Sequence, residues 1–136
     1  MNNLSKKFLL ISGISGALAV GLGAFGAHAF KPMLIAADRL ATYETAVLYH
    51  FIHTQALFGL AIILNIHQKT GFKYAGIAFT TGIVIFSGSL YVLCFSGISW
   101  LGAITPIGGI LFIIGWLLVA FSIIGKSNGL DQPSES

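Results

Sequence analysis

Charged residues are scarce in this chain of 136 residues: Asp, Glu, Lys and Arg together make up 8% of it. Soluble globular domains have about a quarter of their residues charged, so this composition excludes a surface that is solvated in the ordinary way. Hydrophobic residues make up 56% of the chain, and the mean hydropathy is +0.90. The composition therefore indicates an integral membrane protein, and the length favours a single domain.

Cysteine is almost absent, and the basic residues are thinly spread. The lone Cys94 cannot form an intramolecular disulfide, and its place inside an apolar run is typical of a small packing residue. The formal net charge is +3, but the basic residues stand at the ends of apolar runs instead of forming a basic patch. We therefore expect membrane lipid as a partner and no nucleic acid.

The motifs of common enzyme chemistry are also missing. The sequence has no Ser-His-Asp order, no zincin H-E-x-x-H and no phosphate-binding loop, so we expect no enzyme. The stretch "GLGAFG" (21–26) matches the G-x-G-x-x-G dinucleotide fingerprint, but it lies late in an apolar segment with no strand before it. This context argues against nucleotide binding, and nothing in the sequence requires a cofactor.

What the chain does have is four long apolar stretches. A helix crosses the hydrocarbon core with about 20 residues at roughly 1.5 Å each, and the stretches 8–29, 46–66, 74–95 and 103–124 meet that length. The short connection at 96–102 makes the last two spans antiparallel neighbours, and Thr105-Pro106 is typical of a helix start. We predict an all-α fold, an antiparallel four-helix transmembrane bundle over residues 1–125. A polar cytoplasmic tail follows at 126–136.

The positions of the basic residues predict the orientation. One side of the membrane collects five of them, namely Lys6, Lys7, Lys69, Lys73 and Lys126, and the other side has only Lys31 and Arg39. By the positive-inside rule both termini are cytoplasmic. We therefore expect a multi-pass protein of the bacterial inner membrane.

The first span has a second interpretation. It follows a basic start and ends in Ala27-His28-Ala29, which is similar to a signal-peptide cleavage site. A hydrophobic region of a signal peptide runs about 7 to 15 residues, and this one is long enough to span the bilayer, so we favour a retained helix. Cleavage would leave three spans.

Small residues form two stripes on the first span. One stripe holds Gly13, Ala17, Gly21 and Ala24, and the other holds Gly16, Ala19, Gly23 and Ala27. Such stripes let transmembrane helices approach closely. We expect close helix packing, with a homo-oligomer or contact with other membrane proteins as a further use of these Gly-rich faces.

Polar residues gather in "TYETAVLYHFIHT" (42–54), where Asp38 is a suitable N-cap for a helix that begins before the apolar segment. His50 and His53 are neighbours on a helix surface, while Glu44 is not beside them. Counting inward along each span places further polar residues in the same outer half of the bundle. We predict an outward-facing polar pocket; its candidates are His28, Tyr43, Glu44, Tyr49, His50, His53, Ser87, Ser89, Tyr91 and Thr105.

The three outer histidines allow two roles. His28, His50 and His53 are candidate ligands of a metal or haem, because imidazole is the commonest metal ligand. Alternatively, His50 and His53 form hydrogen bonds with hydroxyls of other helices, such as those of Ser87, Ser89 or Tyr91, and we favour this interpretation. Which of the two holds is not decided by the sequence.

A carboxylate near hydrocarbon is costly unless it is paired, solvated or protonated. Glu44 is therefore a candidate proton acceptor or cation site near the outer mouth. Its structural alternatives are a pair with His28 or Arg39, or contact with headgroup water from the helix end.

Several separated motifs agree with one family. "GAFGAHAF", "TYETAVLYHFIHTQAL", "FSGSLY" and "GAITPIGG" followed by "GW" together resemble the YgdD-like small inner-membrane proteins, domain-of-unknown-function family 423, which have an animal transmembrane relative. The resemblance covers about residues 5–125. It implies a four-helix membrane protein and supplies no biochemical activity or residue roles.

Two functions remain open. The first, which we favour, is a structural or accessory membrane component with the outward polar pocket. The second is a protein that binds or transports a metal, haem, proton or small ligand through the His, Glu and Tyr residues of 42–54.

Overall fold

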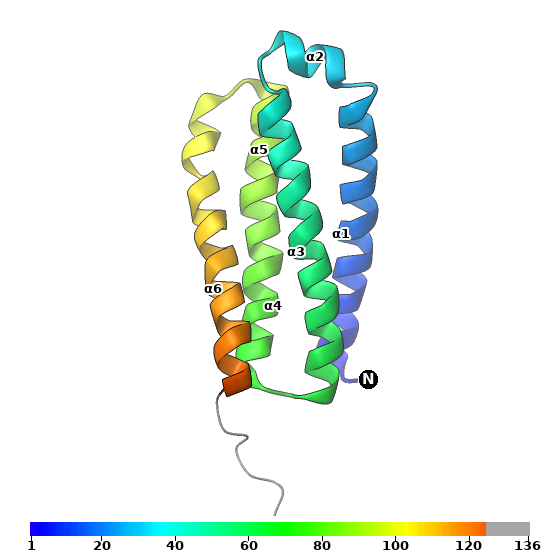
Figure 1. Cartoon of the computed structure of the whole chain (residues 1–136), viewed down its shortest axis with the longest axis vertical. Helices are drawn as coiled ribbons and strands as arrows, with labels where there is room; N and C mark the ends of the chain where they lie inside the picture. Colours follow the sequence, from blue (N-terminus) through cyan, green and yellow to red (C-terminus); the bar gives the residue numbers. More distant parts are fainter. Residues whose placement is uncertain (125–136) are drawn as a thin grey trace, which may run out of the picture.

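The computed structural model describes residues 1–124, and the regular secondary structure in this range is entirely helical. The first two spans are α1 (Asn3–Ala27) and α3 (Leu40–Ile66). The third span runs without a break through α4 (Thr70–Gly82), the π-helical η1 (Ile83–Ser87) and α5 (Gly88–Ser96). The fourth is α6 (Thr105–Ile124), preceded by the 3₁₀ segment η2 (Ser99–Ala103), and the short α2 (Lys31–Ala36) crosses one end of the bundle (Figure 1).

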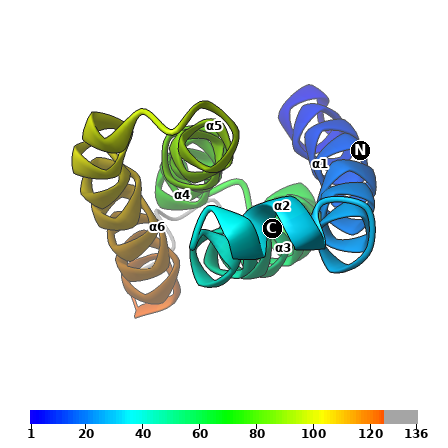
Figure 2. The ribbon, with the colours of Figure 1, turned by 90° about the horizontal axis from the view of Figure 1, so that it is seen from above.

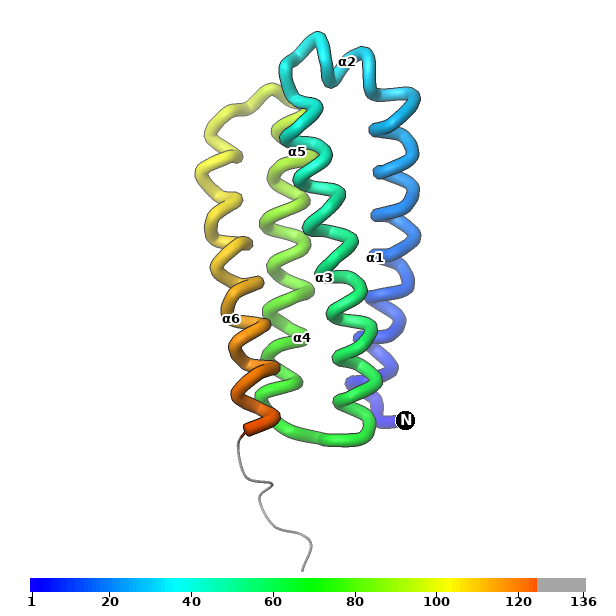
Figure 3. The backbone as a smooth tube through the Cα atoms, viewed as in Figure 1, coloured from blue at the N-terminus to red at the C-terminus, as the bar shows by residue number. Residues whose placement is uncertain are grey.

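The prediction of four membrane-crossing helices is confirmed. Four helices are long and apolar enough to cross a bilayer: Asn3–Ala27, Leu40–Ile66, Thr70–Ser96 and Ser99–Ile124. The start of α1 and the end of α6 lie at the same end of the bundle, as the tube in Figure 3 shows. The predicted tail at 126–136 lies outside the described residues.

The helix ends follow local chemistry, with one correction. α1 is capped by Asn2, whose side-chain oxygen accepts the Ser5 N–H at 2.7 Å, and α6 begins at Thr105 as predicted. The expected N-cap at Asp38 is wrong. Asp38 has a left-handed backbone (φ 53°), a conformation that Asp adopts more easily than most residues, and it closes the turn after α2 while α3 begins at Leu40.

Seen from above, the four spans form a zigzag (Figure 2). α1 packs on α3, α3 packs on the third span, and the third span packs on α6. α1 and α6 lie at opposite ends of this zigzag, and each side of it has a gap between two helices that do not pack closely. α3 closes the inner side of the gap between α1 and the third span, and the third span closes the inner side of the gap between α3 and α6.

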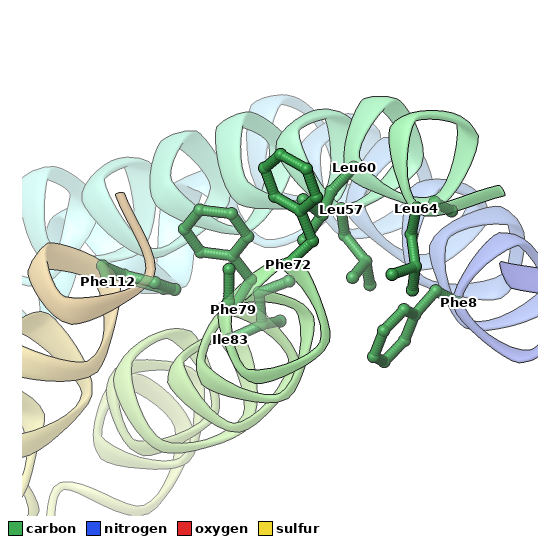
Figure 4. Close-up of a cluster of buried hydrophobic side chains, with 10 residues drawn as sticks. Phe8, Leu57, Leu60, Leu64, Phe72, Phe79, Ile83 and Phe112 are labelled. Atoms are coloured by element: carbon green, nitrogen blue, oxygen red, sulfur yellow. The ribbon is translucent and has the colours of Figure 1, made fainter. Parts of the chain in front are cut away.

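The largest apolar core lies between α3, α4 and their neighbours (Figure 4). Phe8 reaches it from α1 and Phe112 from α6, while Leu57 and Phe79 are almost fully buried at its centre. A smaller cluster of Leu34, Tyr43, Leu93 and Cys94 closes the end covered by α2. The lone cysteine is buried, which agrees with a packing role.

Helices approach most closely where one of them carries a glycine. A Cβ at Gly108 of α6 would lie 2.5 Å from the backbone nitrogen of Phe86 and 2.8 Å from its Cα, in the π-helical segment. On α1, Gly23 faces Val47 of α3, whereas an added Cβ at Gly13 or Gly21 would meet no atom within 4 Å. One predicted stripe therefore packs on α3, and the other is left open.

Candidate functional site

Two lateral cavities flank α3. The first, here called the His50 crevice, has a volume of about 440 Å³ and lies between α1 and the third span, with α3 behind it. Its walls include Ile14, Ser15 and Leu18 of α1, His50 of α3, and Val84 and Tyr91 of the third span. The second, here called the His53 crevice, has a volume of about 510 Å³ and lies between α3 and α6. It is lined by Tyr49, His53, Phe86, Ile110, Phe112 and Trp116.

The π-helical segment contributes to both cavities. Val84 and Ser87 face the His50 crevice, and Phe86 between them faces the His53 crevice. Ser87 Oγ donates to the carbonyl oxygen of Ala46 at 2.8 Å, which ties this segment to α3. π-helical turns inside α-helices are frequent at functional sites, and here the turn lies where the third span faces two cavities at once.

A chain of four polar groups runs from the interior to the His50 crevice, and three of them, Ser15, His50 and Tyr91, line the crevice. Thr54 Oγ1 lies 2.6 Å from Ser15 Oγ, and Ser15 Oγ lies 3.0 Å from His50 Nε2. On the other side of the ring, His50 Nδ1 lies 3.2 Å from the Tyr91 hydroxyl. The chain thus joins α3, α1 and α5, and every link lets either partner donate because hydroxyls rotate and a neutral imidazole has two tautomers.

The chain has two possible directions, which leave different hydrogens unused. If Tyr91 starts the donation toward His50, the Thr54 hydroxyl ends the chain with a hydrogen and no acceptor among the described residues. Thr54 is only 4% exposed, and an unsatisfied buried donor costs about 1–3 kcal/mol. The reverse direction, Thr54 to Ser15 to His50 to Tyr91, leaves the spare hydrogen on Tyr91, which is partly exposed and lines the crevice. The second direction is therefore the one whose spare hydrogen points into a cavity, where a bound molecule is able to accept it.

The polar chain lies deep in the span. Ser15 is the central residue of α1, and His50 is three residues from the centre of α3, or about 5 Å at the rise of an α-helix. His50 is 5% exposed. Polar side chains at this depth have no bulk water, so the protein satisfies them internally.

His53 has a different set of partners. Its Nδ1 lies 2.8 Å from the carbonyl oxygen of Tyr49, which only accepts, so Nδ1 carries the hydrogen. Nε2 then accepts from the indole N–H of Trp116 at 3.3 Å. The ring stacks on Phe112 with centroids 3.4 Å apart and an interplanar angle of 8°. His53 is therefore held as one neutral tautomer in an aromatic stack.

The candidate metal ligands do not converge. His28 is exposed at the C-cap of α1, and all four ring nitrogens of His50 and His53 are in hydrogen bonds, three to other helices and one to the Tyr49 carbonyl oxygen of α3 itself. Within residues 1–124, no group of three or more His, Cys, Asp or Glu side chains is arranged to hold a metal. Ligation by His50 or His53 requires breaking contacts that now satisfy a buried ring.

Glu44 is exposed and lines a separate, smaller cavity of about 310 Å³ next to Tyr43. Over residues 1–124 it forms no ion pair with His28 or Arg39. Of the three interpretations of this carboxylate, contact with headgroup water at the helix end fits its exposure best.

The remaining candidates hold helices together. Tyr43 is 1% exposed, and its hydroxyl donates to the Leu22 carbonyl oxygen at 2.7 Å. The Ser89 and Thr105 hydroxyls lie 2.8 Å apart and link α5 to α6. These residues are part of the packed interior.

The ten candidates therefore do not line one outward pocket. His50, Ser87 and Tyr91 face the His50 crevice, Tyr49 and His53 face the His53 crevice, and Tyr43 and Glu44 face the smaller cavity of about 310 Å³. The physical reason is that α3 packs between two neighbours, so residues three apart on its surface meet different helices. Sequence reasoning missed Ser15, Thr54 and Trp116, because a single polar residue in an apolar span does not reveal which helix it faces.

Comparison with known proteins identifies relatives along most of the chain. Residues 22–109 match the family described as "Protein of unknown function (DUF423)". The chain is 42% identical over 120 residues to the UPF0382 membrane protein YwdK of Bacillus subtilis, covering 88% of this chain and 97% of that protein. It is 39% identical to a UPF0382 membrane protein of Staphylococcus epidermidis, with 88% and 96% covered. To the UPF0382 inner membrane protein YgdD of Escherichia coli it is 35% identical, with 89% and 92% covered.

No solved structure matches the chain. The relatives carry membrane-protein names, and four helices of this chain are able to cross a bilayer. Together these findings describe a bacterial multi-pass membrane protein.

Proposed function

The chain belongs to the DUF423 family, and we propose that it is a non-catalytic component of the bacterial inner membrane that binds a small molecule dissolved in the lipid phase. The observation that carries this proposal is the His50 crevice. Its volume of about 440 Å³ lies within the 300–1,000 Å³ typical of small-molecule sites. Apolar walls with a few convergent polar groups are also the usual composition of such sites.

The position of the crevice supports entry from the membrane. Leu18 of α1 and Val84 of the third span, on its two walls, are 56% and 67% exposed. In a bilayer such side chains face lipid tails, so the crevice opens sideways into hydrocarbon. A molecule already dissolved there reaches the polar chain without crossing water.

We extend the proposal to orientation. Lys6, Lys7, Lys69 and Lys73 belong to the end of the bundle where α1 starts and the third span begins, and Lys31 and Arg39 flank α2 at the other end. By the positive-inside rule the first end is cytoplasmic. A reporter fused after Ser136 should then be active only in the cytoplasm; periplasmic activity would reverse the assignment.

The accessory role remains a second candidate because one face of α1 is open. Gly13 and Gly21 have no other atom within 4 Å of an added Cβ, and small residues at this spacing favour helix association in lipid. Gly21→Leu should lower self-association measured by energy transfer in vesicles. Unchanged association would remove this candidate.

The ligand-binding proposal is tested on protein purified in mild detergent from its native membrane. Bound compounds are extracted with organic solvent and quantified per mole of protein by mass spectrometry. Leu18→Trp fills the His50 crevice, and Ile110→Trp places the same bulk in the His53 crevice at a residue of similar exposure, 57% against 56%.

The proposal predicts one neutral compound in near-stoichiometric amount in the wild type and in Ile110→Trp, reduced at least about tenfold in Leu18→Trp. A wild-type extract with no compound above the level of bulk lipid contradicts the proposal. So does equal loss in the two variants.

A further inference from the structure

The geometry points to a specific chemical class for the ligand of the His50 crevice: an uncharged, apolar molecule with a carbonyl oxygen that accepts a hydrogen bond from the Tyr91 hydroxyl. This inference rests on the proposed ligand-binding function and goes one step beyond it. It follows from the hydroxyl hydrogen that is available in the crevice, from the absence of charge in the lining, and from the depth of the crevice in the membrane.

Tyr91 is the hydroxyl whose hydrogen remains unused in this crevice. Thr80 Oγ1 donates to the Gly76 carbonyl oxygen at 2.8 Å, and Ser87 Oγ donates to that of Ala46 at 2.8 Å. The Ser15 hydrogen is committed to His50 when the polar chain runs from Thr54 to Tyr91. Among the described residues that line the crevice, the phenol of Tyr91 is therefore the donor free to meet a ligand, and a ligand needs an acceptor to use it.

The lining argues against a charged ligand. Within the described chain, no Asp, Glu, Lys or Arg lines the His50 crevice. A charge brought to this depth would lose its hydration with no opposite charge to meet it. A neutral carbonyl loses less hydration and regains one hydrogen bond from Tyr91.

Depth argues against an ordinary membrane lipid as the source of the carbonyl. The Tyr91 hydroxyl is 3.2 Å from His50 Nδ1, and His50 is about 5 Å from the middle of α3 at 1.5 Å per residue. The ester groups of glycerolipids lie at the edges of the hydrocarbon core, about 15 Å from its middle. A molecule without a charged headgroup lies wholly inside the core and brings its carbonyl to this level.

The inference is tested with two probes of matched length, hexadecan-2-one and hexadecane, added to purified protein and counted as adducts by native mass spectrometry. One hydrogen bond between groups in a membrane corresponds to a preference of about threefold to twentyfold, so wild-type protein should retain the ketone over the alkane by that ratio. Tyr91→Phe should bring the ratio to about one.

Tyr49→Phe is the matched control. Tyr49 lines the His53 crevice, and its hydroxyl forms no hydrogen bond within residues 1–124. This variant should keep the wild-type preference. A preference that disappears in Tyr49→Phe and persists in Tyr91→Phe overturns the inference.

The wild-type ratio is independent of whether Tyr91→Phe folds. A ratio of one in wild-type protein, with both probes lost in Leu18→Trp, means that the crevice binds hydrocarbon without regard to the carbonyl; this result overturns the inference and leaves the proposed function standing. Retention of neither probe overturns the proposed function itself. Displacement of the ketone by an equal amount of dipalmitoyl phosphatidylglycerol contradicts the headgroup-free class.

Discussion

The two crevices on either side of α3 are similar in size, about 440 and 510 Å³, and each is lined by a buried histidine of α3. They differ in the partners of that histidine. His50 touches two hydroxyls, which donate or accept. His53 touches a carbonyl that only accepts and an indole that only donates. The hydrogen bonds of His50 therefore keep a choice of direction, whereas those of His53 have one fixed direction.

This difference shows that the role of a membrane histidine depends on what its partners are able to donate. The spacing of His50 and His53 makes them look like one pair of ligands. Their surroundings separate them. His53 is a packing residue in an aromatic stack, and His50 is a member of a reversible hydrogen-bond chain. The side of α3 that faces α1 is therefore the side whose histidine is available for ligand chemistry.

The largest expected effect concerns the close contact that fixes α6 beside the His53 crevice. Gly108→Ala places a Cβ within 2.8 Å of the Phe86 backbone, which is unable to rotate away as a side chain would. We expect a loss of about 3 kcal/mol in the free energy of unfolding, measured by detergent titration in bicelles. Gly109→Ala is the control, because its nearest neighbour would be 3.8 Å away. Equal losses would show that α6 is not held at this contact.

A smaller effect separates a buried wall residue of the His53 crevice from an exposed wall residue of the His50 crevice. Phe112 is 3% exposed and stacks on His53, whereas Leu18 is 56% exposed on the His50 crevice. Phe112→Ala should cost about 2 kcal/mol, mainly through the cavity that it leaves, and Leu18→Ala should cost less than about 0.5 kcal/mol. The same detergent titration in bicelles measures both free energies of unfolding. A comparable cost at Leu18 would mean that α1 closes over the crevice.

The polar chain itself is tested by a double-mutant cycle. Ser15→Ala and His50→Ala should be coupled by about 0.6–1.7 kcal/mol, the range for hydrogen bonds between membrane helices. Ser15→Ala with His53→Ala should show coupling near zero, because Ser15 bonds to His50 and Thr54. Coupling to both histidines would merge the two sites that the comparison separates.

The smallest effect is expected at Glu44, which belongs to neither crevice. Glu44→Gln should change the free energy of unfolding by less than about 0.5 kcal/mol, as surface substitutions do. The change is compared with one at the neighbouring residue. Tyr43→Phe removes the hydrogen bond to the Leu22 carbonyl oxygen and should cost about 1 kcal/mol of unfolding free energy. A larger loss for Glu44→Gln would indicate a buried partner for the carboxylate.

Features carried by long stretches or by fixed local geometry could be predicted from the sequence. The four spans depend on apolar length, and the start of α6 at Thr105 depends on the proline that follows. The short α2, the left-handed Asp38 and the π-helical turn were not foreseen. α2 packs on α1 and α3, and the π-helical turn packs on α3 and α6, contacts that one sequence does not reveal. The conformation of Asp38 follows from the end of α2 just before it.

The candidate site divides in the same way. The importance of His50 and its hydrogen bond to Tyr91 agree with the favoured interpretation of the histidines. Ser15 and Thr54 could not be found, because the face of α1 that meets α3 depends on helix rotation. His53 and His50 were placed in one pocket because sequence spacing shows neighbours on a helix but not the helices around it.

The most direct test of the difference between the crevices is the infrared spectrum of hexadecan-2-one, labelled with ¹³C at its carbonyl and bound to the protein. The account predicts a carbonyl band shifted to lower frequency by a hydrogen bond, present in wild-type protein and in Tyr49→Phe and absent in Tyr91→Phe. A band at the frequency of the free ketone in wild-type protein, or a shifted band that survives Tyr91→Phe and disappears in Tyr49→Phe, would contradict it.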